Sequence, residues 1–275
     1  MAALAADPTG AHLGLTLPAG RVVEDDEGRP ILWISDDEPP DGDDIDALRD
    51  AFARTGLWPL ILEALNEAEE PRPWLSGEIG QGWASDPDRF DADEVLARWW
   101  AESVEVGPEA DDEERRAALA VSAPYHGWPG RAVAVRRSSG HEGPAPDDTA
   151  SEMTSILLDS DQIHAPRLGL IACARSSDVP AAIGWMGPAN FEEDVATHCS
   201  VLRTWEDRFG TRLIGLGFDI MRLSVANPPT TYEHAIQIAA EHFAFCPDNI
   251  DQGAGTLENY ARTLVDCPAW VFWWD

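Results

Sequence analysis

One stretch of the chain, AEHFAFCPD, contains the side chains with the clearest chemical potential. His242 and Cys246 are four residues apart, so a helix would place both on one face. A thiolate beside an imidazole can bind zinc or form a nucleophile–base pair. Glu241 would orient the imidazole, while Glu206 and Asp248 would add carboxylates. Glu206, His242, Cys246 and Asp248 are therefore the catalytic candidates. His242 and Cys246 are also the metal candidates, with zinc as the cofactor.

The same spacing is also typical of ordinary packing. A cysteine between Phe245 and Pro247 at a helix end often serves as a small buried hydrophobic residue. A histidine near a helix C-terminus often interacts with the helix dipole. Zinc would need a third ligand, which the spacing does not identify. Both interpretations therefore stay open at the level of sequence.

The end of this helix is expected to pack on the apolar segment that closes the chain at Asp275. That packing would gather several polar side chains in one cluster: Glu241, His242, Cys246 and Asp248. Carboxylates at a helix C-terminus are unfavourable unless a cation compensates them. The cluster therefore predicts Arg208, Arg222 or a metal ion beside it.

Aromatic residues provide a second group of candidates, because the chain contains 12 tryptophans. Trp58, Trp83 and Trp128 lie in Pro- and Gly-rich surroundings, which favours loops. Loop tryptophans near acidic residues are typical of interfaces and cation-binding pockets, although packing beneath long loops is the commoner use. The binding candidates are Trp58, Trp83, His126, Trp128, Trp185 and Asp275.

Two short acidic stretches, D-G-D-D from Asp41 and D-P-D from Asp86, superficially resemble calcium-binding loops. Each has an apolar residue at its fifth position, Ile45 or Phe90, and each lacks the central glycine. We therefore interpret both as solvated acidic loops.

Composition excludes several function classes. The 275 residues include 50 Asp and Glu against 19 cations, all of them arginine, for a net charge of −31. Without lysine there is no pyridoxal phosphate chemistry and no P-loop nucleotide site. Excess negative charge also disfavours nucleic acid as a partner. It favours a basic protein, which makes an acidic protein-binding protein, of immunity-like or regulatory type, the leading hypothesis. The alternative is a small-molecule enzyme, such as a metal-dependent hydrolase, using the Glu/His/Cys/Asp site.

The sequence shows no pattern typical of a membrane-spanning segment or a signal peptide. No run of about 18 apolar residues occurs, and the N-terminal stretch has no cationic region before an apolar one. The four cysteines form no C-x-x-C pair and are interpreted as reduced thiols. We expect a soluble cytoplasmic protein without a membrane partner.

These candidates must be positioned by two regions of different character. An acidic α/β region is predicted over 1–140, followed by a linker or long loop at 141–152, which is rich in Pro, Ser and Asp. In the first region, residue patterns predict strands over 13–17, 21–23, 31–34 and 131–137, and helices over 43–54 and 91–102.

The second region, 153–275, is predicted to be an α+β domain in which helices cover a short mixed sheet. Its apolar runs predict strands over 168–174, 213–218, 221–225 and 269–274. Its periodic segments predict helices over 190–209, 230–245 and 257–265.

Spaced motifs in this second region resemble a bacterial family catalogued as a domain of unknown function. The resemblance covers roughly 165–275. It rests on W-E-x-R-F-G from Trp205, E-H-x-x-x-C-P-D from Glu241, and the terminal W-W-D from Trp273. It implies no substrate, cofactor or catalytic residue.

Overall fold

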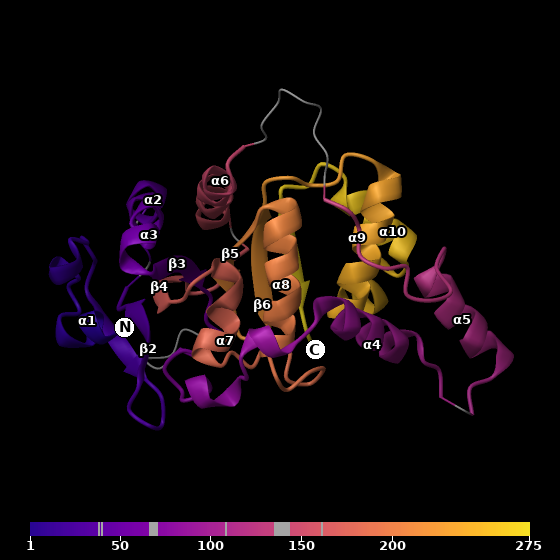
Figure 1. Ribbon diagram of the computed structural model, residues 1–275, viewed down its shortest axis with the longest axis horizontal. Coiled ribbons are helices and arrows are strands. Elements are labelled where there is room, and N and C mark those ends of the chain that lie inside the picture. The colour runs from indigo at the N-terminus through magenta and orange to yellow at the C-terminus, as the bar shows by residue number, and fades with distance from the viewer. Residues whose placement is uncertain (38, 40, 66–70, 108, 135–143, 161) are drawn as a thin grey trace.

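A single mixed sheet forms the centre of the computed structural model, which describes residues 1–37, 39, 41–65, 71–107, 109–134, 144–160 and 162–275 (Figure 1). Seven strands of the described residues pair in the order β1-β2-β4-β3-β5-β6-β7. Only β3 and β5 pair in parallel among the neighbours; the other neighbours are antiparallel. The strands are β1 (Gly20–Glu24), β2 (Pro30–Ser35), β3 (Leu57–Leu62), β4 (Arg167–Ala172), β5 (Thr211–Leu216), β6 (Ile220–Val225) and β7 (Ala269–Trp273).

Helices cover both faces of this sheet and extend beyond its β7 side (Figure 1). The α-helices are α1 (Ala2–Ala6), α2 (Gly42–Asp50), α3 (Phe52–Thr55), α4 (Ala92–Val104), α5 (Asp112–Ser122), α6 (Pro146–Leu158), α7 (Val179–Ile183), α8 (Ala196–Phe209), α9 (Tyr232–Phe245) and α10 (Leu257–Leu264). Short 3₁₀ turns are η1 (Ala11–Leu13), η2 (Gln81–Trp83), η3 (Pro87–Arg89) and η4 (Ser176–Asp178), and η5 (Asn249–Ala254) is a π-helical turn.

Side-chain alternation along the strands creates the two faces. In β3, Trp58 and Leu60 point into the larger core, which is shared with α4, α8 and α9. Leu57 and Ile61 point the other way, into a smaller core that includes residues of α1, α2 and α6. Successive strand residues face opposite sides of a sheet, so β3 contributes to both cores at once. The sheet is therefore the middle of three layers.

The α+β fold class and the mixed sheet agree with the sequence prediction. The sheet is larger than predicted, however, because β1, β2 and β3 of the first region belong to it, and β2 and β3 pair with strands of the second. Strand β3 was not predicted. The predicted linker also differs, since helix α6 begins at Pro146, with Asp147 and Asp148 in its first turn. Residues 141–143 lie outside the described part.

Two predicted strands of the first region are wrong in the described residues. At 13–17, Gly10 and Gly14 adopt left-handed backbone conformations that turn the chain around η1. At 131–134 the backbone has no strand partner, because the N–H and C=O of Ala132 bond to the side chains of Glu241 and Arg208. The rest of that prediction, 135–137, lies outside the described residues.

The predicted helix over 190–209 starts later, at Ala196. Turns occupy the preceding residues, in which the amides of Phe191 and Glu192 both donate to the carbonyl of Pro188. Asp194 accepts a hydrogen bond from the backbone N–H of Ala196 at 3.2 Å, close to the start of the helix. Predicted helices near 43, 91, 230 and 257 and strands near 168, 213, 221 and 269 are present, with ends shifted by a few residues.

The outer edge of β7 is occupied by side chains. Asn249 donates through its amide nitrogen to the carbonyl of Val271 at 2.7 Å. Its amide oxygen accepts from the N–H of Trp273 at 3.4 Å, and the Cys246 thiol donates to the Trp273 carbonyl at 2.9 Å. Asn249 thereby acts as a short substitute for another strand, which protects an edge that would otherwise pair with other chains. No described helix is long and apolar enough to cross a membrane.

Candidate functional site

Glu206 lies on α8 and links that helix to η4. Its carboxylate accepts hydrogen bonds from Arg175 Nε at 3.3 Å, from the Ser176 hydroxyl at 3.3 Å and from the Ser177 N–H at 3.2 Å. Arg212 from β5 lies 3.6 Å from the same carboxylate. The position is thus a junction between helix, turn and strand, and Glu206 lies apart from the other catalytic candidates.

Glu241 is completely buried and fully hydrogen-bonded. Arg208 meets it through two parallel contacts of 2.6 and 2.7 Å. Trp205 Nε1 donates to it at 2.7 Å, and the N–H of Ala132 donates at 2.8 Å. The predicted arginine compensation is therefore present at Arg208. The predicted orienting role toward His242 is not seen, because both carboxylate oxygens of Glu241 are engaged with these other donors.

His242 is buried among aromatic rings. Its Nδ1 lies 3.1 Å from the hydroxyl of Tyr260, while Nε2 has no hydrogen-bond partner among the described residues. The rings of Trp270, Trp205 and Phe272 lie 4.5, 4.9 and 4.9 Å from it. Burial, with a further contribution from Arg208, lowers the pKa of His242 well below its ordinary value. The imidazole is therefore neutral, and Tyr260 sets its orientation.

Cys246 is buried at the end of α9. Its thiol donates to the Trp273 carbonyl at 2.9 Å, and it also lies 3.5 Å from the amide oxygen of Asn249. Burial raises the pKa of the Cys246 thiol to about 12. A protonated thiol is a poor nucleophile and a poor metal ligand. His242 and Cys246 thus leave one helix but bind different partners.

Asp248 and Asp275 do meet, as the sequence predicted for this end of the molecule. The N–H of Asp275 donates to the carboxylate of Asp248 at 3.1 Å, and Asn190 donates to the carbonyl of Asp275 at 3.4 Å. The polar cluster is divided, however: Glu241 faces α8, whereas Cys246 and Asp248 face the end of β7. Within the described ranges, no group of three His, Cys, Asp or Glu side chains is placed to hold a metal ion.

The aromatic candidates occupy different environments. Trp58 lies in β3, 1% exposed, and donates to the carbonyl of Leu213, so its interpretation as a loop residue is wrong. Trp185 is fully buried and donates to the carbonyl of Gly217 at 2.8 Å. Trp128 is half-buried, with its ring 6.0 Å from that of Trp100. Trp83 and His126 each line a cavity of the described surface.

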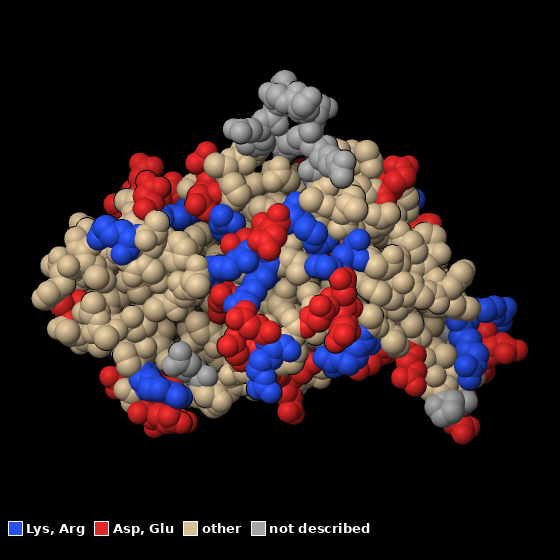
Figure 2. All heavy atoms as spheres, viewed as in Figure 1, with Lys and Arg blue, Asp and Glu red and all other residues tan. Residues whose placement is uncertain are grey.

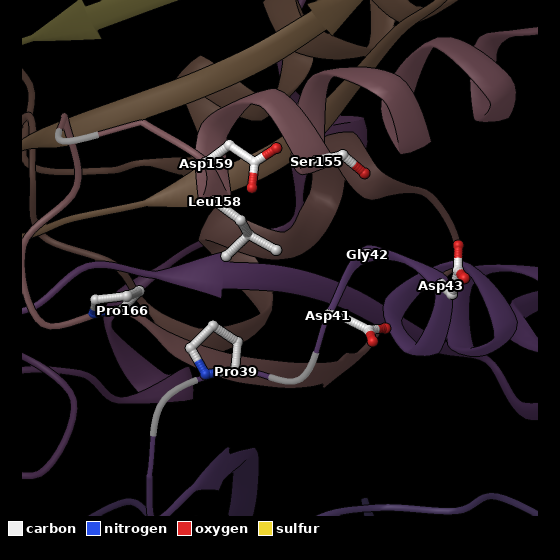
Figure 3. A pocket seen from close by; sticks show the side chains of 8 residues that line it. All are labelled: Pro39, Asp41, Gly42, Asp43, Ser155, Leu158, Asp159 and Pro166. Atoms are coloured by element: carbon white, nitrogen blue, oxygen red, sulfur yellow. The ribbon is translucent and has the colours of Figure 1, made fainter.

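A larger cavity, here called the carboxylate pocket, was not recognised from the sequence. It has a volume of about 540 Å³ and lies between the start of α2 and the end of α6. Figure 3 shows Asp41 and Asp43 on one side and Asp159 on the other, with Leu158 pointing toward the chain at Pro39. Its lining comprises Pro39, Asp41, Gly42, Asp43, Ser155, Leu158, Asp159 and Pro166. This lining contains three carboxylates and no arginine.

Arg49 fixes the two walls of the carboxylate pocket relative to each other. This buried side chain of α2 contacts Asp46 at 2.6 Å and reaches across to Ser151 at 2.8 Å and Thr154 at 3.0 Å on α6. Gly42 also brings the walls together, because a Cβ there would lie 2.4 Å from Ser155 Oγ. The pocket is therefore formed before any ligand binds.

The helix ends make the pocket electrostatically uneven. Asp41 caps α2, accepting from the N–H of Asp44, so its charge is favourable beside the positive helix N-terminus. Asp159 instead follows the last turn of α6, where the carbonyl dipole is negative and no basic residue is present. A carboxylate at that position gains from a cation supplied from outside.

The sequence shows one wall of this pocket but not the other. The D-G-D-D stretch is recognisable in the sequence as acidic, and three of its residues, Asp41, Gly42 and Asp43, line the cavity. Asp159 could not be paired with it, because α6 was predicted to be partly linker, and the two walls are far apart in the chain.

Comparison with known proteins finds a family model that matches one part of the chain. Residues 167–275 match the model of Domain of unknown function (DUF4253). This range contains β4 to β7 and α7 to α10, including Glu206, His242, Cys246, Asp248 and Asp275. No curated protein and no solved structure matches the chain.

Proposed function

We propose that the protein binds a basic protein partner and that the carboxylate pocket receives a lysine or arginine side chain of that partner. The observation that carries the proposal is the pocket lining, with carboxylates from Asp41, Asp43 and Asp159 and no cation. A guanidinium or ammonium group is the chemical complement of such a lining. The volume of about 540 Å³ suits an organic group better than a single ion.

The protein's own cations support the same proposal, because many of them are already neutralised. On the face shown in Figure 2, arginines lie against acidic side chains. Ion pairs to Asp or Glu involve Arg21, Arg29, Arg49, Arg72, Arg98, Arg131, Arg175, Arg203, Arg208, Arg212 and Arg222. With 50 acids against 19 arginines, most carboxylates have no arginine available, and an external cation would meet them.

Association with such a partner would be accelerated by charge and weakened by salt. A protein of net charge −31 attracts a basic surface before contact, which raises the association rate. Salt screens this attraction over a Debye length of about 8 Å at physiological ionic strength.

The experiment uses N-acetylarginine amide as a probe and follows backbone amide resonances of the whole protein by nuclear magnetic resonance. Binding in the pocket is expected to shift the resonances of Gly42 and Ser155, with affinity on the order of 1 mM. The uncharged probe N-acetylnorleucine amide should leave both resonances in place.

Two variants of equal net charge provide the control. The first neutralises the pocket with Asp41→Asn, Asp43→Asn and Asp159→Asn. The second neutralises three exposed acids near or on α5, with the substitutions Glu109→Gln, Asp112→Asn and Glu113→Gln. Only the first should abolish the shifts. Equal binding by both variants would show that bulk charge, not the pocket, recognises the cation. Shifts with calcium chloride but none with the arginine probe would replace the protein partner with a metal ion.

The alternative of a small-molecule enzyme draws no specific support from the described geometry. Its candidates His242 and Cys246 are buried and line none of the described cavities.

A further inference from the structure

A second cavity, here called the Trp83 pocket, shares no lining residue with the carboxylate pocket and differs from it in chemistry. It has a volume of about 250 Å³ and a mainly apolar wall. Trp83 is 43% exposed and Met186 is 38% exposed, so two large apolar side chains face solvent at one place. The full lining is Pro73, Gly77, Glu78, Trp83, Met186 and Phe218.

Trp83 is held in its exposed position by the packing of its own loop. Its N–H donates to the carbonyl of Gly80 at 3.0 Å. That loop lies against Gly184, where a Cβ would come within 2.0 Å of the Gly80 carbonyl oxygen. Two residues further on, the N–H of Ser85 donates to Asp194 at 3.0 Å. The backbone that carries Trp83 is thus fixed while a large part of the indole stays in water, and exposed tryptophans on an ordered backbone are typical anchors of interfaces.

The opposite wall is equally ordered. Arg72 forms a two-point ion pair with Glu78, and its guanidinium lies 5.0 Å from the centre of the Phe218 ring. Arg72 also holds the pKa of the Glu78 carboxyl down at about 2, so this pair stays charged and closed. The pocket therefore has fixed sides and offers an apolar interior of about 250 Å³.

Negative charge accumulates beside this interior. Asp219 follows Phe218 directly in the chain. Partial burial, and then the neighbouring carboxylates of Glu63 and Asp275, raise the pKa of Asp219. Arg222 already pairs with Glu63 at 3.0 Å, whereas no ion pair among the described residues involves Asp219 or Asp275, so a cation supplied from outside would relieve the repulsion between these two. The surface thus combines an apolar hollow with a nearby site for positive charge.

We propose that the Trp83 pocket binds an apolar side chain of a partner protein whose neighbouring basic side chain contacts Asp219. Trp83 and Met186 would cover the apolar group, and the acidic side would select the basic neighbour. This inference deepens the proposed function by naming an apolar anchor, and it rests on that function for the basic character of the partner. Its residues are separate from the carboxylate pocket, so each site can be tested alone.

Three capped dipeptide amides test the inference: N-acetyl-Phe-Arg, N-acetyl-Phe-Glu and N-acetyl-Gly-Arg. The readout is the indole N–H resonance of Trp83 in the full chain, identified by its loss in Trp83→Ala. The Phe-Arg probe should shift this resonance with the highest affinity, on the order of 1 mM. The Phe-Glu and Gly-Arg probes should each bind at least about fivefold more weakly, since each lacks one of the two contacts.

Variants assign the two contacts. Asp219→Asn should reduce the preference for Phe-Arg over Phe-Glu, and Met186→Gln should weaken both phenylalanine probes. Leu119→Ala, which removes an exposed apolar side chain on α5, is the control and should change nothing. The inference is wrong if no probe shifts the Trp83 resonance, or if Gly-Arg binds as well as Phe-Arg. It is also wrong if Phe-Glu binds as well as Phe-Arg. If one of these results is obtained while N-acetylarginine amide still shifts the Gly42 resonance, the further inference is wrong but the proposed function is not contradicted.

Discussion

Buried neutral histidines are expected to make the fold lose stability as the pH falls. His198 is fully buried, and the rings of Trp99, Phe245 and Trp274 lie 4.6, 4.8 and 5.5 Å away. Burial lowers the pKa of His198 from 6.5 to about 3, and a hydrogen bond with the backbone of Phe245 opposes this shift only in part. The pKa of His242 is lowered in the same direction.

Proton binding to the unfolded chain explains why the free energy of unfolding falls as the pH falls. Below the unfolded pKa of 6.5 the unfolded chain takes up protons that folded His198 and His242 refuse, so acid favours unfolding. For each histidine the free energy of unfolding should fall by roughly 1 to 2 kcal/mol between about pH 7.5 and about pH 5.5. The two histidines together should lower the free energy of unfolding by about 3 kcal/mol over this range, and the decrease continues until the pH reaches the folded pKa values.

The measurement is urea unfolding of the wild type and of His198→Phe at these two pH values. Phenylalanine fits an aromatic cage and has no ring nitrogen to leave unpaired, so its cost should be about 1 kcal/mol or less above the histidine range. At the acidic pH the variant should gain roughly 1 to 2 kcal/mol relative to wild type. Carboxylates titrate alike in both proteins, so their effect cancels in this difference. Leu264→Ala, which changes no titratable group, should lower the free energy of unfolding by the same amount at both pH values. If wild type and His198→Phe respond identically to pH, the reasoning about this histidine fails.

Further predictions concern packing and reactivity. Arg208→Met alone should cost about 3–5 kcal/mol of unfolding free energy because it leaves Glu241 buried without its cation, whereas adding Glu241→Leu should recover part of the loss, as denaturant unfolding can show. Asn249→Ala should cost about 1–3 kcal/mol and, by exposing the β7 edge, should increase self-association measured by light scattering. Gly184→Ala should lower the melting temperature, because a Cβ there meets a backbone carbonyl and φ is positive, whereas an unchanged melting curve would refute the close packing. Cys246 should resist a thiol reagent in the native protein and react on unfolding, and rapid native labelling would contradict its raised pKa.

What the sequence determined by itself is largely local. Apolar residues at helical spacing predicted α4, α9 and α10, and continuous or alternating apolar runs predicted β4 to β7. Such patterns reflect which side of an element is buried, and they need no knowledge of the partner. The resemblance over roughly 165–275 also agrees with the segment that the family model matches, 167–275.

Tertiary structure alone decided the features that depend on pairing between distant residues. Pro59 lacks an N–H and argues against a strand, yet β3 tolerates it because its bonds to β5 begin only at Ile61. Glu241 was assigned to His242 from proximity in the chain, whereas Arg208, on another helix, provides better geometry.

The candidate site shows the same division. An acidic stretch at Asp41 is visible in the sequence, but an acidic stretch becomes a pocket only when a second wall faces it. That wall, from Ser155 to Asp159, lies more than 100 residues away and is held there by Arg49 crossing from α2 to α6. The local pattern of the stretch is the same whether or not such a wall is present. Whether three carboxylates meet around one cavity is decided by the packing of helices on the sheet, because that packing brings their charges within range of a single cation.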